Sequence, residues 1–167
     1  LTWVRWDDVR KGLYDPLERL VLQDLDKTDA EILYPSPRIS INLFTTNDDV
    51  EYHEAMVRAY NDWLSEFCAH APERLLGLAL IPTTGLASAI QEMKRVMKLP
   101  GIRGITLGRW PTGALGISPE DDEFWWEAEN SNVPISIHVS LASAQETGGP
   151  SPFFGAFTGA LRFADAP

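Results

Sequence analysis

Residues 133–140 contain the side chain best suited to chemistry in this sequence, a histidine. The β-branched residues of the segment indicate a short strand, in which side chains point alternately to opposite faces. The isoleucines therefore share an apolar face, whereas Ser136, His138 and Ser140 share a polar face. An imidazole near the C-terminal end of a strand lies where parallel α/β folds place their catalytic groups. His138 is thus either a functional residue or a buried histidine paired with a neighbouring backbone group.

The rest of the chain alternates between strand and helix patterns, which would set this histidine in a parallel sheet. Strands are predicted over residues 30–34, 75–81, 102–107 and 133–140. Helices are predicted from residues 16, 50, 86 and 119, and Asp15, the Asn47–Asp49 run and Ser118 precede three of them as capping residues. Repeated β–α units of this length predict parallel strands, adjacent in chain order, with helices on one side.

Two architectures fit this order, an open doubly wound sheet and a (β/α)8 barrel. The sequence has neither a G-x-G-x-x-G turn nor a Walker pattern, so phosphate or dinucleotide binding gets little support. A barrel accepts inward polar residues near its catalytic rim and so explains the face that carries His138 better. Four strands are about half of a barrel. We therefore predict an α/β fold of the (β/α)8 TIM-barrel type, with residues 1–167 forming a single partial domain.

Composition excludes several classes of function. The net charge of −10 argues against nucleic acid as a partner, because phosphates require a basic face. No apolar run approaches the roughly 20 residues that span a bilayer, so no membrane partner is expected. Much of the acidity falls within residues 120–129, which we interpret as a solvated helix face. The single cysteine, Cys68, lies in a helical apolar pattern and is interpreted as core filler, typical of a reducing cytoplasm.

Five segments in the same order resemble the amidohydrolase-related metal enzymes, which include aminocarboxymuconate-semialdehyde decarboxylase and related aromatic-acid decarboxylases. These segments are Leu33-Tyr34-Pro35-Ser36, Arg58-Ala59-Tyr60-Asn61-Asp62-Trp63-Leu64, Pro72-Glu73-Arg74-Leu75 with Gly77-Leu78-Ala79-Leu80-Ile81-Pro82, Gly104-Ile105, and Pro134-Ile135-Ser136-Ile137-His138-Val139. The resemblance implies that the chain corresponds to strands two to five of the family barrel. It also implies that His138 is a ligand of a catalytic divalent metal, with zinc as the expected ion.

The chain departs from the family pattern in its other metal ligands. No His-x-His pair occurs in the sequence, and the family's first-strand pair would precede residue 1. The later ligands would follow residue 167, so we expect the chain to be a fragment. Of the remaining histidines, His53 is interpreted as at most a surface residue, and His70 as a cation at a helix C-terminus. A catalytic zinc site takes about three protein ligands, so this chain alone is expected to hold no stable catalytic metal.

Arg109 and Trp110 are the candidate substrate-binding residues. Both follow the strand at 102–107, on the rim where a small-molecule carboxylate would approach, and an arginine fork suits carboxylates. The alternatives are a solvated loop cation for Arg109 and packing over the core for Trp110. Arg38 is a weaker candidate of the same kind. We interpret Asp62 as a structural hydrogen-bonding residue. The residues Trp3, Trp6, Trp125 and Trp126 are interpreted as packing or subunit contacts.

Two hypotheses on function follow. In the first, the full-length protein is a metal-dependent enzyme that decarboxylates or hydrolyses a small unsaturated or aromatic carboxylate and forms a homo-oligomer. In the second, the chain is a non-catalytic half-barrel that self-associates and binds no metal, because an unclosed sheet leaves two open edges and an apolar face. No residue is assigned as the catalytic acid or base.

Overall fold

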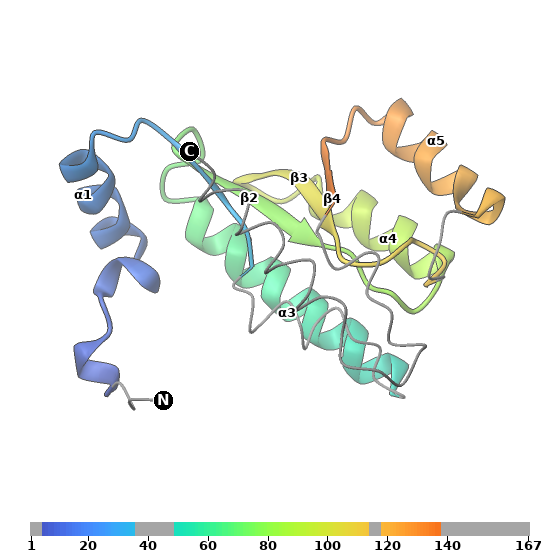
Figure 1. Cartoon of the computed structure of the whole chain (residues 1–167), viewed down its shortest axis with the longest axis horizontal. Helices are drawn as coiled ribbons and strands as arrows, with labels where there is room; N and C mark the ends of the chain where they lie inside the picture. Colours follow the sequence, from blue (N-terminus) through green and yellow to red (C-terminus); the bar gives the residue numbers. More distant parts are fainter. Residues whose placement is uncertain (1–4, 36–48, 114–117, 138–167) are drawn as a thin grey trace, which may run out of the picture.

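The computed structural model describes residues 5–35, 49–113 and 118–137, which form a layer of helices on a parallel sheet (Figure 1). The strands are β1 (Glu31–Leu33), β2 (Leu75–Leu80), β3 (Ile102–Leu107) and β4 (Ile135–Ile137). They are hydrogen-bonded in the order β1-β2-β3-β4, and each neighbouring pair is parallel. The predicted order and direction of the strands are confirmed.

The helices begin close to where the capping residues predict. They are α1 (Pro16–Asp26), α3 (Val50–Cys68), α4 (Leu86–Val96) and α5 (Asp122–Asn130), with 3-10 turns η1 (Trp6–Asp8), η2 (Lys11–Leu13) and η3 (Pro119–Asp121). The side chains of Asp15 and Asp49 accept backbone N–H bonds at the starts of α1 and α3. Ser118 does the same for η3, which runs directly into α5.

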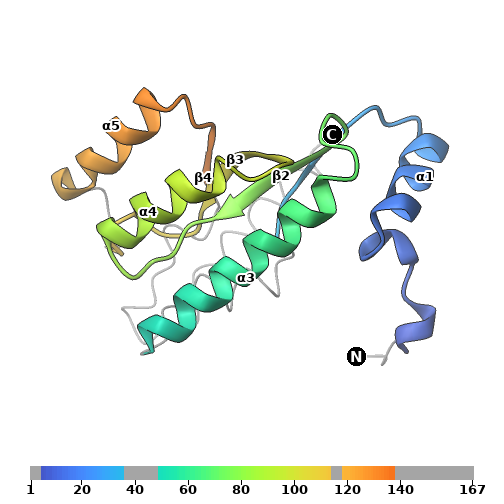
Figure 2. The same ribbon diagram turned by 180° about the vertical axis from the view of Figure 1, so that it is seen from behind.

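The core lies between the sheet and the helices α3, α4 and α5, which cover one of its faces (Figure 2). Ala79 of β2 and Ile105 of β3 are fully buried against this layer, as is Met93 of α4. The apolar spacing that predicted the long helix is confirmed at Val57 and Leu64, which are 1% and 2% exposed. Burial of this apolar face is what holds the helices on the sheet.

A buried polar network fixes α3 on β2 beyond the end of β1. The Asn61 amide accepts from the Leu80 N–H at 2.8 Å and donates to the Leu80 carbonyl at 2.9 Å, replacing the partner that a neighbouring strand would supply. Its second N–H is donated to Glu92 at 2.8 Å. Arg95 donates to Glu92 and, at 2.6 Å, to Asp62. The interpretation of Asp62 as a structural hydrogen-bonding residue is confirmed.

The described sheet is strongly curved, as a segment of a barrel must be. The Tyr34 hydroxyl, directly after β1, lies 3.0 Å from the Ser136 hydroxyl of β4. Strands β2 and β3 separate these two edge strands, and about 14 Å would separate the edges of a flat four-stranded sheet. Side chains that stand perpendicular to a flat sheet would not meet over that span. The side chains meet because the face away from the helices is concave.

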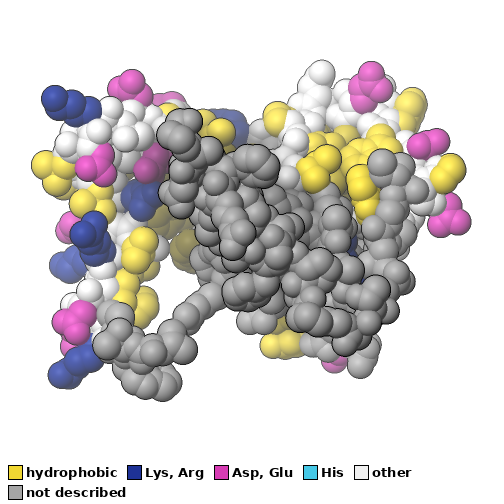
Figure 3. Space-filling model, viewed as in Figure 1, with side chains coloured by type: hydrophobic (Ala, Val, Ile, Leu, Met, Phe, Trp, Pro, Cys, Tyr) yellow, Lys and Arg dark blue, Asp and Glu magenta, His cyan; other side chains and the backbone are white. Residues whose placement is uncertain are grey.

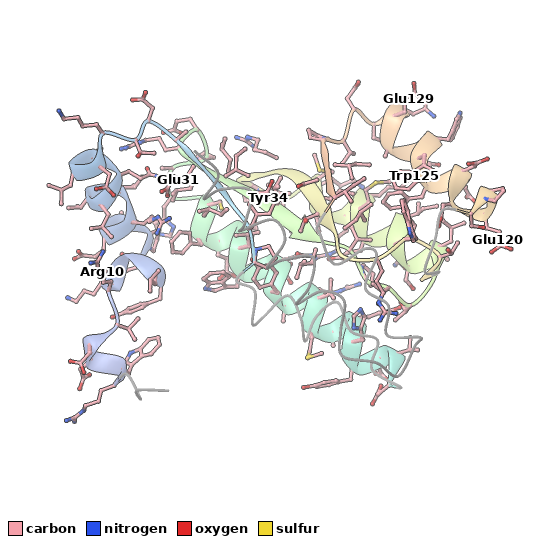
Figure 4. The ribbon with its side chains drawn as sticks, viewed as in Figure 1. Arg10, Glu31, Tyr34, Glu120, Trp125 and Glu129 are labelled. Carbon is pink, nitrogen blue, oxygen red and sulfur yellow. The ribbon has the colours of Figure 1, made fainter. Side chains whose placement is uncertain are left out.

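Helix α1 packs differently from the other helices. The apolar residues that predicted it, Leu17, Val21 and Leu25, are 62%, 54% and 72% exposed. In the space-filling view, apolar side chains of this part of the molecule are exposed between basic and acidic ones (Figure 3). Only Leu20 of this helix packs against the described core. The helix is also joined to the sheet by polar contacts, in which Glu31 of β1 accepts from Arg19 at 2.7 Å and from Gln23 at 3.0 Å (Figure 4).

Two further predictions on packing are wrong. The apolar pattern that predicts the long helix starts at Val50, yet this residue is 52% exposed because it lies in the first turn of α3, before the helix reaches the sheet. The apolar face that Ile135 and Ile137 share predicts that both pack against the helices, yet Ile137 is 59% exposed. Only Ile135 packs on the core, because Ile137 ends an edge strand of the described sheet. None of the described helices is long and apolar enough to span a membrane.

Candidate active-site rim

The C-terminal ends of the strands lie at one edge of the sheet, because all neighbouring pairs are parallel. The register pairs Thr106 of β3 with Ser136 of β4, whose hydroxyl meets Tyr34 on the concave face. Thr106 is fully buried, and its hydroxyl has no hydrogen-bond partner in the described part of the chain. With the Tyr34 hydroxyl on Ser136, the concave face therefore carries hydroxyl groups close to the strand ends.

The segment that follows β3, residues 108–113, is the rim loop, and it carries Arg109 and Trp110. Both residues are half-buried. The loop closes with a bond from the Gly113 N–H to the Trp110 carbonyl at 2.7 Å. It is tied to η3 at the start of α5 by the Thr112 N–H, which is donated to Asp121 at 2.8 Å. The expected position of the loop at the C-terminal ends of the strands is confirmed.

Trp110 packs edge-on against Trp125 of α5, with ring centroids 6.1 Å apart. Figure 4 shows Trp125 on the helix that borders this edge of the sheet. Packing over the core, which the sequence offered as the alternative for Trp110, accounts for part of its surface. Contact between Trp110 and a substrate stays a prediction.

His53 is buried at the rim, and its interpretation as a surface residue is wrong. It is 0% exposed, and its Nε2 accepts the backbone N–H of Thr83 at 3.3 Å. Burial lowers the pKa of His53 below its ordinary value of 6.5; the Glu54 carboxylate opposes this shift, and the Arg109 guanidinium adds to it. The imidazole is therefore neutral at pH 7. The signal was present in the sequence, because His53 continues the apolar stripe of Val57 and Leu64 at helical spacing.

Glu54, next to His53, joins α3 to the start of α4. Its Oε1 accepts from the hydroxyls of Thr84 and Ser88, both at 2.6 Å. The bond from Ser88 has the largest effect on the pKa of Glu54, followed by the bond from Thr84, and together they hold this pKa below its ordinary value of 4.5. Gly85, the N-cap of α4, makes no side-chain cap, so a carboxylate from a neighbouring helix stands near this helix start instead. Glu54 and Ser88 also line a small surface hollow between the two helices.

The metal-ligand prediction falls on residues that the structure does not describe. His138 lies outside the described residues, as do Arg38 and Trp3. Among residues 5–35, 49–113 and 118–137, no three His, Cys, Asp or Glu side chains are grouped as a metal site would require. His70 is exposed after the end of α3, with its Nδ1 3.0 Å from the Glu66 carbonyl. The described residues therefore contain no complete metal centre of their own.

The remaining predicted residues have structural positions. Cys68 is fully buried in the core, and burial raises the pKa of its thiol to about 11, so it is inert filler as predicted. Trp125 packs on Phe124, whereas Trp6 and Trp126 are 66% and 62% exposed. The acidic stretch at 120–129 is mainly a solvated helix face, with the exception of Asp121, which is fully buried beside the rim loop.

Comparison with known proteins identifies a family. The amidohydrolase family model matches residues 37–163. Among curated proteins, the gamma-resorcylate decarboxylase of Rhizobium radiobacter is 30% identical over 142 residues, and that of Rhodococcus jostii is 29% identical over 145 residues. Each alignment covers 80% of this chain and 42% of the relative. The chain thus spans about two fifths of the length of these decarboxylases.

Solved structures agree on the fold. The 2,6-dihydroxybenzoate decarboxylase from Rhizobium is 27% identical, with a TM-score of 0.58 over 72% of this chain and 38% of that chain. The dihydroxybenzoic acid decarboxylase of Polaromonas sp. JS666, solved with manganese and 2-nitroresorcinol, has a TM-score of 0.63 at 21% identity. This alignment covers 97% of this chain and 47% of the Polaromonas protein. The four parallel strands and their helices therefore match part of a TIM-barrel decarboxylase, as predicted.

Proposed function

Because the chain belongs to the amidohydrolase family, we propose that it is part of a metal-dependent decarboxylase acting on a small aromatic carboxylate. The register of β3 with β4 carries this proposal. Leu107 pairs with Ile137, Arg109 follows β3 by two residues, and His138 follows β4 by one residue of sequence. If the chain continues in the direction of β4, adjacent parallel strands would supply a cation suited to carboxylates and a residue suited to metal ligation from the same edge of the sheet.

The proposed chemistry assigns one task to each residue. Decarboxylation breaks the bond between the carboxylate and the ring carbon, which keeps the electron pair and takes up a proton as CO₂ leaves. Arg109 would bind and orient the carboxylate through its guanidinium fork, and Trp110 would offer an aromatic surface to a planar substrate. A divalent metal, when bound, supplies Lewis acidity and an activated water. None of the described residues is proposed as the proton donor.

His138 is the one residue of this chain that we propose as a metal ligand. A neutral imidazole binds Zn²⁺ more tightly than Mn²⁺, whereas the Polaromonas decarboxylase holds manganese. The proposal is therefore a divalent ion, with zinc as the narrower prediction from the sequence. Hydrolysis by the same activated water is the alternative reaction. A single domain over residues 1–167, a homo-oligomer and a cytoplasmic location also stay predictions.

A second candidate is a self-associating half-barrel without catalysis. It is favoured by the exposed stripe on α1, where Leu17, Val21 and Leu25 are all more than half exposed. Strands β1 and β4 also lie at the two edges of the described sheet. A second copy could cover both features. Stoichiometric metal and CO₂ release from the full-length protein would exclude this candidate.

The test uses the full-length gene product that contains this sequence, stripped of metal and reloaded with Mn²⁺ or Zn²⁺. CO₂ release is measured from 2,6-dihydroxybenzoate and from related aromatic acids. His138→Ala should lower metal occupancy and abolish turnover. Arg109→Ala should raise KM about tenfold to a hundredfold, because a charge-assisted hydrogen bond to the substrate is lost.

Arg103→Ala is the matched control, because Arg103 lies near the opposite end of β3 and donates to the Pro72 carbonyl at 2.9 Å. This variant should keep the KM of the wild type. Full activity of His138→Ala would refute the assignment of the metal ligand. Equal KM values for the two arginine variants would remove Arg109 from the substrate site.

A further inference from the structure

We propose that His53 is a positioning residue that holds the rim loop, residues 108–113, in place through the turn at Thr83. His53 lies on an outer helix and follows no strand, so neither strand ends nor metal spacing point to it. The holding role stands on the geometry of described residues. Only its consequence for substrate binding rests on the proposed function.

The first contact in this arrangement joins α3 to the turn after β2. His53 accepts the Thr83 N–H through Nε2, so its proton must sit on Nδ1. Both residues are buried, at 0% and 4% exposed. An apolar side chain at position 53 could fill the space, but it would leave a buried N–H without this partner. The imidazole therefore does more than pack.

The second contact joins that turn to the rim loop. Gly113 has a φ of +83° and lies so close to Thr83 that a Cβ on it would be 2.9 Å from the Thr83 carbonyl. A glycine is required there on both counts. The rim loop thus lies against the carbonyl of the same residue, Thr83, whose N–H is donated to His53. Because the Gly113 N–H closes the loop onto Trp110, a shift of Thr83 would be passed to the residues that carry the proposed substrate contacts.

The third observation is electrostatic and concerns Arg109. Its guanidinium is close enough to His53 to disfavour the charged imidazole, whereas Glu54 from the same helix favours it. A protonated His53 could not accept the Thr83 N–H and would add a second positive charge near Arg109. Holding the loop in place therefore requires the neutral imidazole that burial maintains.

The test compares His53→Leu with His53→Gln, which keeps a hydrogen-bond acceptor at the end of the side chain. His70→Leu, at an exposed histidine just beyond the same helix, is the control. Hydrogen exchange of the Thr83 and Gly113 amides is followed by NMR on the chain. In His53→Leu both amides should exchange about tenfold faster or more, because a buried donor loses its partner. In His53→Gln both should stay near the wild-type rate, as in the control.

Faster exchange at Thr83 with wild-type protection at Gly113 would show a local role and overturn the proposal. If His53→Leu does not fold, the proposal is tested instead by an NMR pH titration of the wild-type chain. The Thr83 and Gly113 amide shifts should then follow the His53 ring with one midpoint below 6.5. A Gly113 shift that does not follow the ring would overturn the proposal equally.

The effect on substrate is measured separately in the full-length protein. His53→Leu should raise KM for the aromatic acid several-fold and change kcat less, and His53→Gln should restore KM. If the wild type releases no CO₂ at all, the proposed function fails, whereas the exchange rates still decide the role of His53. An unchanged KM beside faster exchange would confine His53 to holding a loop that does not touch substrate.

Discussion

The middle of α3 directs a polar side chain to the backbone of β2, and its N-terminal end directs one to the turn after β2. The two regions differ in how completely these polar atoms are paired. In the middle, Asn61 bonds both backbone groups of Leu80 and the Glu92 carboxylate. At the N-terminal end, His53 makes one bond to Thr83. The second ring nitrogen of His53 and the Thr83 hydroxyl have no partner in the described part of the chain.

The region around Asn61 therefore contributes to stability, whereas the region around His53 can change its hydrogen bonding more easily. A fully paired buried network rigidifies the fold, because breaking any member leaves other buried polar atoms unpaired. A partly paired site is less stable and can respond to protonation or to a bound molecule. The comparison therefore predicts large losses of stability around Asn61, and smaller, pH-dependent ones around His53.

The largest effect is expected for Asn61→Ala. The substitution leaves the Leu80 amide and carbonyl without their buried partner and removes one donor from Glu92, which keeps its bonds from Arg95. The free energy of unfolding should fall by about 3–5 kcal/mol, measured by urea denaturation. Asn130→Ala, at the exposed end of α5, is the matched control and should change it by less than about 0.5 kcal/mol. Similar losses in both variants would contradict the view of α3 as anchored through Asn61.

A smaller effect is expected from acid. Burial first, and then the Arg109 guanidinium, keep the pKa of His53 below 6.5, so on acidification the unfolded chain takes up its proton at a higher pH than the folded chain does. The His53 contribution to stability is therefore complete above pH 6.5 and is lost as the pH falls below it. The difference in unfolding free energy between wild type and His53→Leu should shrink on acidification, by at most about 1.4 kcal/mol per pH unit.

His70→Leu supplies the control for this pH dependence, because His70 is exposed. The unfolding free energy of this variant is measured beside those of the wild type and His53→Leu between pH 7 and pH 5. If instead the wild type and His53→Leu run parallel over this range, His53 does not change its protonation preference on folding.

The smallest effect is expected at the junction of α3 and α4. Ser88→Ala removes one of the two hydroxyl bonds to Glu54, while the bond from Thr84 remains. A loss of about 1 kcal/mol is expected at pH 7, where the carboxylate is charged. Because these bonds lower the pKa of Glu54, the loss should disappear as the pH falls below 4.5. Ser131→Ala, at an exposed position after α5, should have no comparable effect on thermal unfolding.

The sequence predicts features that depend on neighbouring residues, but not contacts between residues that are far apart in the chain. The strands at 75–80 and 102–107 follow from local apolar runs, and the starts of α1 and α3 follow from capping residues, because these signals depend on near neighbours. The pairing of Asn61 with Glu92, 31 residues away, depends on how two helices meet on the sheet. No local pattern carries that information.

The site was predicted less completely than the fold. The rim position of Arg109 follows from the end of a strand, whereas His53 was missed because a histidine in an outer helix was expected at the surface. Its place on the stripe with Val57 and Leu64 was the available signal. Periodicity also does not say what an apolar face packs against, so Leu17 and Leu25 predicted a helix correctly but not their exposure.

Alkylation of Cys68 can report how often the core of each variant opens. It is the only thiol in the sequence, and it lies under Gly101, where even a Cβ would overlap the cysteine. With its pKa raised to about 11 and no exposed surface, the thiol cannot react with an alkylating reagent while the core is closed. Each labelled molecule must therefore have opened between α3 and the sheet. The rate of alkylation, followed by mass spectrometry, would rank the variants by how often α3 separates from the sheet. Each chain can be labelled only once, because it has one thiol.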